Sequence, residues 1–164
     1  MLNLTFPKII GVVAEGGSNT FISKAIKFFS RGTVSHVEFL LENGQTIGSR
    51  EFRGVQIGDI KEFKNPQSYM FWNFIENKPL DLTQYQTDKL EFFFHSTLGN
   101  EYDYRGIVGF LFNKHEMNDI EKHFCSEYIF EALEFAGIKP LNREGGHFVT
   151  PQNIVESLLF KRVN

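Results

Sequence analysis

The sequence predicts an α+β fold in which an antiparallel, hairpin-rich sheet packs against helices. Two observations indicate this class. β-favouring segments cluster in one block between residues 35 and 75, and helical patterns lie in separate blocks before and after it, without the βαβ alternation of a parallel sheet. The 164 residues contain no repeat, low-complexity stretch or linker, so we expect a single domain over residues 1–164.

The first half of the chain predicts one helix and then the strands of the sheet. Ser18 can cap a helix that ends near Gly32, because apolar residues recur between them at helical spacing. The dipeptide Asn43-Gly44 is the strongest hairpin signal in the sequence. Strands are therefore expected near residues 35–41, 45–50, 54–58 and 69–75.

The second half predicts three helices. Residues 83–98 have a helical pattern, and Gly99 follows it as a stop signal. A second helix is expected from about Cys125 to Gly137. Thr150 and Pro151 are a cap and a first-turn proline, and they open a third helix in the segment QNIVESLLF.

Composition excludes several classes of function. The chain has 17 basic and 20 acidic residues, so it lacks the positive charge that binds nucleic acid or an anionic membrane. Its 19 Phe predict an aromatic core and are compatible with an apolar groove. The start of the chain lacks signal-peptide features, and no apolar run approaches the roughly 18 residues of a membrane span. We expect a soluble protein without a signal peptide.

The only cysteine, Cys125, lies where a helix is expected to begin. Backbone N–H groups at a helix start favour a thiolate, so Cys125 is a candidate nucleophile; the alternative is a small buried structural residue. Of five histidines, His36 is the best candidate base, because it lies within a predicted strand that would hold it rigidly. His95 falls on a helix as a surface or packing residue. The others lie in predicted loops: His115, His123 and His147.

Motifs for metals and cofactors are missing from the sequence. No two histidines or cysteines have the spacing of a zinc site. The chain also contains no P-loop, no dinucleotide-binding glycine motif and no GxSxG elbow. We therefore expect neither a metal nor a cofactor.

Two segments together resemble a known family. They are SHVEFLLENGQTIGSR, with His36, and FCSEYIFEALEFAG, with Cys125. With the segment YDY before the cysteine and TPQNIVES after it, their order resembles the circularly permuted branch of the NlpC/P60 papain-like cysteine hydrolases. This branch includes YiiX-like, lecithin:retinol acyltransferase-like and phage-encoded proteins, and the likeness covers about residues 8–158. The resemblance implies a permuted papain-like fold and a cysteine hydrolase with Cys125 as nucleophile and His36 as base.

The chain departs from this family at one position. Members usually carry a third polar residue on the strand after the hairpin to orient the imidazole, and here that position is Gly48. Glu38 is our first candidate for the missing group, because residues i and i+2 of a strand project from the same face. A solvated Glu38 on the outer face is the alternative. Weaker candidates are Ser49, Arg50 and Glu51.

Further roles near the cysteine follow from its helix start. The backbone N–H of Cys125 or Ser126 could stabilise an oxyanion, and Glu127 is expected to be structural. The resemblance adds Tyr102 and Asp103 as pocket candidates. In the expected mechanism, His36 takes the thiol proton, Cys125 attacks a carbonyl and water releases the acyl group.

Three classes of function stay open. The first is an amidase or peptidase that acts on a peptide, including a cell-wall peptide. The second is a lipid or ester acyl hydrolase or acyltransferase on the same fold. The third is a non-catalytic phage structural or binding module. The expected partner is a peptide or acyl substrate, without nucleic acid, in a cytoplasmic, virion-associated or cell-wall-associated protein.

Overall fold

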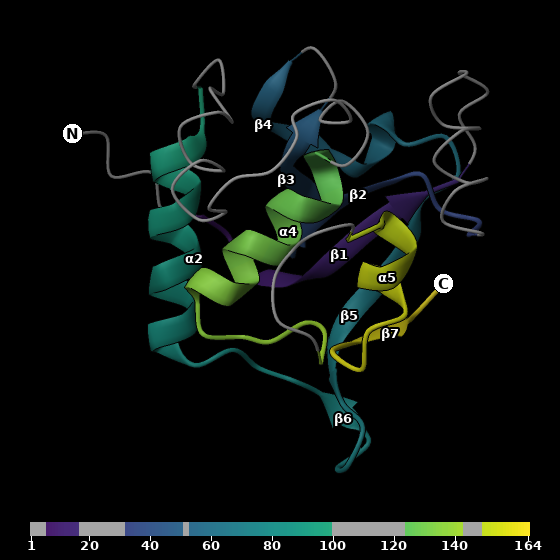
Figure 1. Cartoon of the computed structure of the whole chain (residues 1–164), viewed down its shortest axis with the longest axis vertical. Coiled ribbons are helices and arrows are strands. Elements are labelled where there is room, and N and C mark those ends of the chain that lie inside the picture. The colour runs from purple at the N-terminus through teal and green to yellow at the C-terminus, as the bar shows by residue number, and fades with distance from the viewer. Residues whose placement is uncertain (1–5, 17–31, 51–52, 100–123, 143–148) are drawn as a thin grey trace, which may run out of the picture.

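A computed structural model describes residues 6–16, 32–50, 53–99, 124–142 and 149–164. These residues form one antiparallel sheet with helices against it, which confirms the α+β class (Figure 1). The elements in chain order are β1 (Ile9–Glu15), β2 (His36–Leu41), β3 (Gln45–Arg50), β4 (Gly54–Asp59), the 3-10 helix η1 (Ile60–Glu62), β5 (Gln67–Asn73), β6 (Lys78–Pro79), α2 (Gln84–Thr97), α4 (Phe124–Phe135), α5 (Pro151–Val155) and β7 (Phe160–Arg162).

Within the described residues the sheet has seven strands in the order β4-β3-β2-β1-β5-β6, with β7 also paired to β5. The N-terminal strand β1 lies at its centre, between β2 and β5, and every pairing is antiparallel. The first three strands after residue 35 follow one another as a meander along one edge. This meander carries the candidate histidine, so its register decides what surrounds that residue.

The β2–β3 hairpin forms as the Asn43-Gly44 signal predicts. The Gly44 N–H donates to the Leu41 carbonyl at 3.0 Å, and Gly44 has φ +84°, a conformation that glycine adopts without strain. The Asn43 side chain accepts a hydrogen bond from the Gln45 N–H at 3.0 Å. The turn pairs Phe39 with Ile47.

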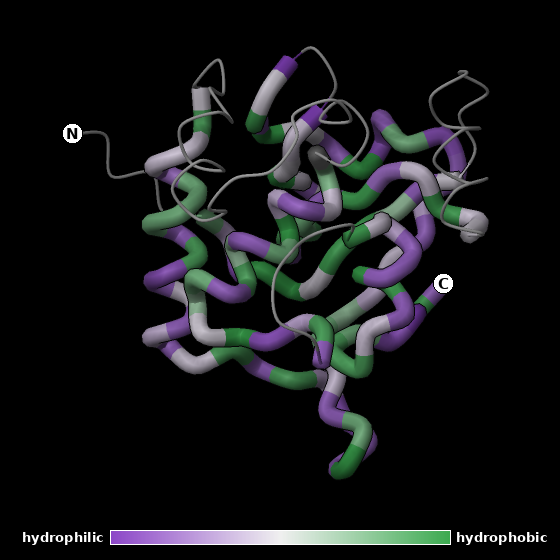
Figure 2. Tube along the Cα trace, in the orientation of Figure 1, coloured by the Kyte–Doolittle hydropathy of each residue, from purple (hydrophilic) through white to green (hydrophobic). Residues whose placement is uncertain are grey.

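Helix α4 crosses one face of the sheet and covers β2 and β3 (Figure 1). Its apolar residues, and those of the strands that it crosses, are coloured green in Figure 2. Phe39 is fully buried beneath this helix, with its ring centroid 5.1 Å from that of Phe94 on α2 and 6.4 Å from that of Tyr128 on α4. The Tyr128 hydroxyl satisfies its polar atom by a 3.0 Å hydrogen bond with Thr97 Oγ1.

Helix boundaries follow the capping signals closely. The Thr83 side chain accepts from the Gln86 N–H and the Gln86 side chain accepts from the Thr83 N–H, a capping box that starts α2 at Gln84. Gly99 and Gly137 follow α2 and α4 with φ +78° and +73°. The helix predicted between Ser18 and Gly32 falls within residues 17–31, outside the described residues.

Some elements differ from expectation. The strand expected at 69–75 lies at Gln67–Asn73, because the Asn73 side chain accepts from the Ile75 and Glu76 N–H groups and forms a turn there. The last helix ends at Val155, and the chain turns so that Phe160 stacks on Phe71 at 5.1 Å as part of β7. The sequence pattern also gave no prediction of β1, β6 or β7.

Candidate active site

The β2 strand places His36 and Glu38 on the same face, as alternation along a strand requires. His36 Nε2 lies 2.8 Å from Glu38 Oε1. The Glu38 side chain is completely buried, whereas 23% of the His36 side chain is exposed. The alternative of a solvated Glu38 is therefore excluded by its burial.

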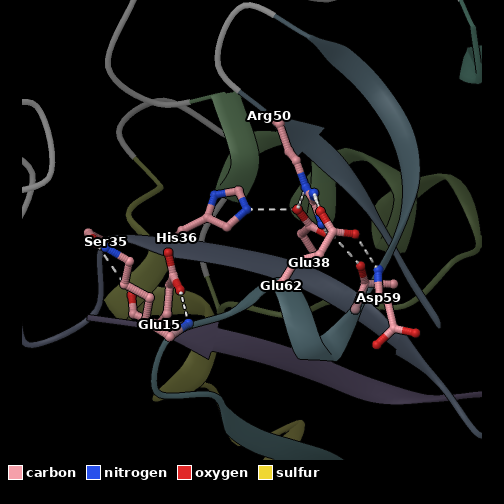
Figure 3. A network of polar contacts seen from close by, with 9 residues as sticks. Glu15, Ser35, His36, Glu38, Arg50, Asp59 and Glu62 are labelled. Atoms are coloured by element: carbon pink, nitrogen blue, oxygen red, sulfur yellow. Dashed lines mark hydrogen bonds and ion pairs between the residues drawn. The ribbon is translucent and has the colours of Figure 1, made fainter. Parts of the chain in front are cut away.

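Arg50 of β3 binds the same carboxylate from the other side (Figure 3). Arg50 Nε donates to Glu38 Oε1 at 2.6 Å, and Nη2 donates to Glu38 Oε2 at 3.1 Å. The remaining terminal nitrogen, Nη1, donates to Glu62 Oε2 at 2.5 Å. Glu62 belongs to the capping box of η1, where its other oxygen accepts from the Asp59 N–H at 2.9 Å. A chain of charged groups thus runs from His36 to η1.

Two glycines provide the space for these side chains. A Cβ at Gly48 of β3 would lie 2.4 Å from Glu38 Cγ, and a Cβ at Gly58 of β4 would lie 2.1 Å from Arg50 Nη2. Both distances are far below van der Waals contact. The position at which the family resemblance expects a polar residue is thus the place over which Glu38 lies.

Cys125 is the second residue of α4, and 8% of it is exposed. The end of α4 that carries Cys125 lies over β2 and β3 (Figure 1). The thiol interacts with the His36 side chain by a hydrogen bond and through its charge. Because Nε2 of His36 contacts Glu38, the other ring nitrogen, Nδ1, is the one left for the thiol.

The surroundings shift the pKa values of His36 and Glu38 in opposite directions. Burial alone lowers the pKa of His36, but the charge and hydrogen bond of Cys125, together with those of Glu38, outweigh it and raise the pKa to about 10. Burial alone raises the pKa of Glu38, but hydrogen bonds from His36, Arg50 and Thr46 and the charge of His36 lower it to about 2. At neutral pH the pair is therefore an imidazolium and a carboxylate.

An aromatic ring lines the same face of the sheet. Phe63, just after η1, stacks on the His36 ring with centroids 5.8 Å apart and planes 30° apart. The Arg50 guanidinium carbon lies 5.9 Å from the centroid of that Phe63 ring. Phe63 is buried in a small cluster with Val13 and Leu40, so it covers the ion pairs with apolar surface.

The other predicted site residues have varied surroundings. Ser126 is buried, and its hydroxyl donates to the Val149 carbonyl at 2.6 Å, so the side chain ties α4 to the segment before α5. Ser49 is buried on β3. Glu127 is half-buried, and burial together with the charge of Glu131 raises its pKa to about 7. Three further candidates lie outside the described residues: Glu51, Tyr102 and Asp103.

The remaining histidines do not join this arrangement within the described residues. His95 is exposed on α2, and its ring centroid lies 4.9 Å from that of Phe6, which agrees with the expected surface or packing role. The other three lie outside the described residues: His115, His123 and His147.

Sequence reasoning missed the partners that hold Glu38. Arg50 was a weak candidate for contacting His36 itself, whereas its guanidinium contacts Glu38. Glu62, Phe63 and Gly58 had no signal of their own. The hairpin register was the available clue: counting outward from the Phe39–Ile47 pair puts Glu38 opposite Gly48 and His36 opposite Arg50.

Within the described residues, no group of three or more His, Cys, Asp or Glu side chains is arranged to hold a metal ion. Neither does any helix there combine the length and the apolar character needed to cross a membrane.

Comparison with known proteins relates the chain to a solved structure by its fold. No protein-family model matches the sequence, and no curated protein matches it. The crystal structure of the metalloprotein YiiX from Escherichia coli O157:H7 is similar, with a TM-score of 0.62 and 16% sequence identity over 98% of each chain. At this identity the likeness concerns the fold, and over nearly its whole length the chain has a YiiX-like fold.

Proposed function

We propose that this protein is a cysteine hydrolase of the permuted NlpC/P60 papain-like type, related to the phage-encoded members, which cleaves an amide bond in a peptide, with cell-wall peptides as the first candidates. One observation carries the proposal. His36 interacts with a buried carboxylate through Nε2 and also with the thiol at the start of an α-helix. A base that contacts both a nucleophile and an orienting group is the arrangement that nucleophilic catalysis requires.

The resting site places a protonated imidazole next to the Cys125 thiol. With a pKa of about 10, His36 is protonated at neutral pH, and a cation next to a thiol favours the thiolate. The N-terminal N–H groups of α4 favour the same negative charge. His36 therefore already carries a proton before the substrate binds.

The reaction follows from this state. The Cys125 thiolate attacks the carbonyl carbon, and the backbone N–H of Cys125 or Ser126 stabilises the oxyanion. The imidazolium donates its proton to the departing amine, which leaves an acyl thioester and a neutral His36. His36 then takes a proton from water, whose oxygen attacks the thioester, and acid and thiolate are released. Glu38 holds the ring and stabilises its positive charge in every charged step.

Acyl esters are the alternative substrates, because the same thioester step serves them. The missing polar residue at position 48 is the argument for the third class, a non-catalytic module of the same fold. The contact between Glu38 and His36 supports the catalytic alternative, since a carboxylate occupies the orienting position.

The site does not fit a metal. The solved structure of similar fold is of a protein named a metalloprotein, but in this chain Arg50 donates to both oxygens of Glu38, so a cation already neutralises that carboxylate. No step of the proposed reaction uses a metal.

The test is the rate at which iodoacetamide alkylates Cys125 at pH 6. A free thiol with a pKa near 8.5 is almost fully protonated there, so we expect the native protein to react about ten-fold faster or more. His36→Ala should reduce the rate to that of a free thiol. His95→Ala, the matched control at an exposed position of α2, should not change the alkylation rate.

Two results would count against the proposal. A native rate equal to that of a free thiol and unaffected by His36→Ala would exclude an activated nucleophile. If the thiol is activated, assays with peptidoglycan fragments and with acyl esters separate the substrate classes, and turnover of esters alone would overturn the peptidase assignment.

A further inference from the structure

The carboxylate that contacts His36 comes from β2, although the resemblance expects the orienting residue on β3. The register explains how this exchange is possible. Glu38 on β2 lies opposite Gly48 on β3, so the two positions share one place on the same face of the sheet. A side chain at either position can fill it, but the 2.4 Å distance from a Cβ at Gly48 to Glu38 Cγ shows that both cannot.

A buried carboxylate needs more than one partner to stay charged and in place. His36 supplies one contact, to Oε1. Arg50 supplies two more, one to each carboxylate oxygen, which is the planar two-point geometry that a guanidinium forms and an ammonium cannot. The two oxygens are thereby held in a fixed plane relative to the imidazole.

The Arg50 guanidinium is itself held in place by its surroundings. Its guanidinium lies where a Cβ at Gly58 would be, and Nη1 binds Glu62. Because Glu62 also accepts from the Asp59 N–H within the capping box of η1, Arg50 is anchored to a short helical turn rather than to a free loop. Only 15% of the Arg50 side chain is exposed.

We propose that Arg50 is a positioning residue that holds Glu38 against His36. Gly48, which has no side chain, leaves the space in which the Glu38 carboxylate of β2 replaces the polar residue expected on β3. This inference rests on the proposed function for its catalytic meaning. The arrangement of the His36 imidazole, however, can be measured without any substrate.

The first experiment compares Arg50→Gln and Arg50→Lys with native protein. Nitrogen NMR of the imidazole follows the titration of His36, and iodoacetamide reports on Cys125 at pH 6. In Arg50→Gln we expect the pKa of His36 to fall toward its ordinary range and the alkylation of Cys125 to slow by about ten-fold. Arg50→Lys should recover part of both, since it keeps the charge and loses the two-point geometry. Arg53→Gln, an exposed arginine after the same strand, is the matched control.

The second experiment is a double-mutant cycle at the shared place. Gly48→Ala should lower the pKa at which His36 titrates and slow the alkylation of Cys125, because its methyl group displaces Glu38. In a Glu38→Ala background the same substitution should have no further effect, since nothing remains to be displaced. Circular dichroism shows whether Arg50→Gln folds. If it does not fold, this double-mutant cycle still tests the proposal.

Two outcomes overturn the inference. One is a folded Arg50→Gln protein whose His36 titration is unchanged; the other is a Gly48→Ala effect of equal size with and without Glu38. A native thiol that reacts like a free one would instead contradict the proposed function and leave the titration results to decide the positioning role.

Discussion

The two faces of the β2–β3 hairpin are both buried, but by opposite means. On one face, Val37, Phe39 and Ile47 pack into the main core beneath α4. On the other, Glu38 and Arg50 are enclosed with two glycines and the ring of Phe63. The first face is stabilised by removal of apolar surface from water. The second must satisfy every charge that it hides, because an unpaired buried charge costs far more than an apolar contact gains.

This difference indicates what each face is for. Buried ion pairs are seldom better for stability than apolar residues of the same shape. A sheet that needed only stability would have filled both faces with apolar side chains. The polar face is therefore explained by what it does to His36, and the two faces should respond differently to substitution.

The largest expected effect is on the apolar face. Phe39→Ala removes a fully buried ring between α2 and α4, and we expect it to lower the free energy of unfolding by about 4 kcal/mol. Urea unfolding measures this loss. Phe92→Ala, which removes an exposed ring of α2, is the control and should cost far less. Equal losses would contradict the described core.

Arg50→Gln should be next, with a loss of about 3 kcal/mol, because it leaves the Glu38 carboxylate buried with fewer partners. The double variant Glu38→Met with Arg50→Met should recover much of this stability, since no charge is left unpaired. The same double variant should lose the rapid alkylation of Cys125. Recovery of stability without recovery of reactivity would separate the two purposes of the face.

Acid should weaken the polar face before the apolar one. The folded-state pKa of Glu38 is about 2, below its ordinary value of 4.5, so its stabilising contribution is present above pH 4.5 and is lost as the pH falls toward 2. Because Glu38 takes up at most one proton, the free energy of unfolding falls by about 2 to 3 kcal/mol over that range. Glu38→Gln should flatten this part of the stability curve. Glu42→Gln, at the exposed turn of the same hairpin, is the control, and a native curve without this slope would contradict the ion pair.

The smallest effect concerns the polar pair within the apolar core. Tyr128→Phe removes the hydrogen bond to Thr97, whose hydroxyl keeps its 2.8 Å bond to the Phe93 carbonyl. We expect a loss of about 1 kcal/mol and unchanged alkylation of Cys125. Tyr85→Phe, at an exposed tyrosine of α2, is the control. A change in thiol reactivity here would mean that the two faces are coupled.

Much of the fold could be predicted because its signals are local. The Asn43-Gly44 turn, the Thr83 capping box and the stop at Gly137 depend on residues within a few positions of one another. The central strand β1 gave no such signal, because a run such as IIGVV, buried at every position except Ile10, lacks the alternation of a half-buried strand. The short strands β6 and β7 are defined only by their pairing with β5.

For the candidate site, the sequence by itself determined which reactive groups the proposed function uses. It provided a thiol at a helix start, a histidine in a strand and a carboxylate two residues later on the same face. Only the tertiary structure decided that the Glu38 carboxylate is buried, that Arg50 and Glu62 hold it, and that Gly48 provides its space. The physical reason is that burial and charge pairing depend on segments up to 24 residues apart in the β2 to η1 region, from Glu38 to Glu62, which no local pattern in the sequence brings together.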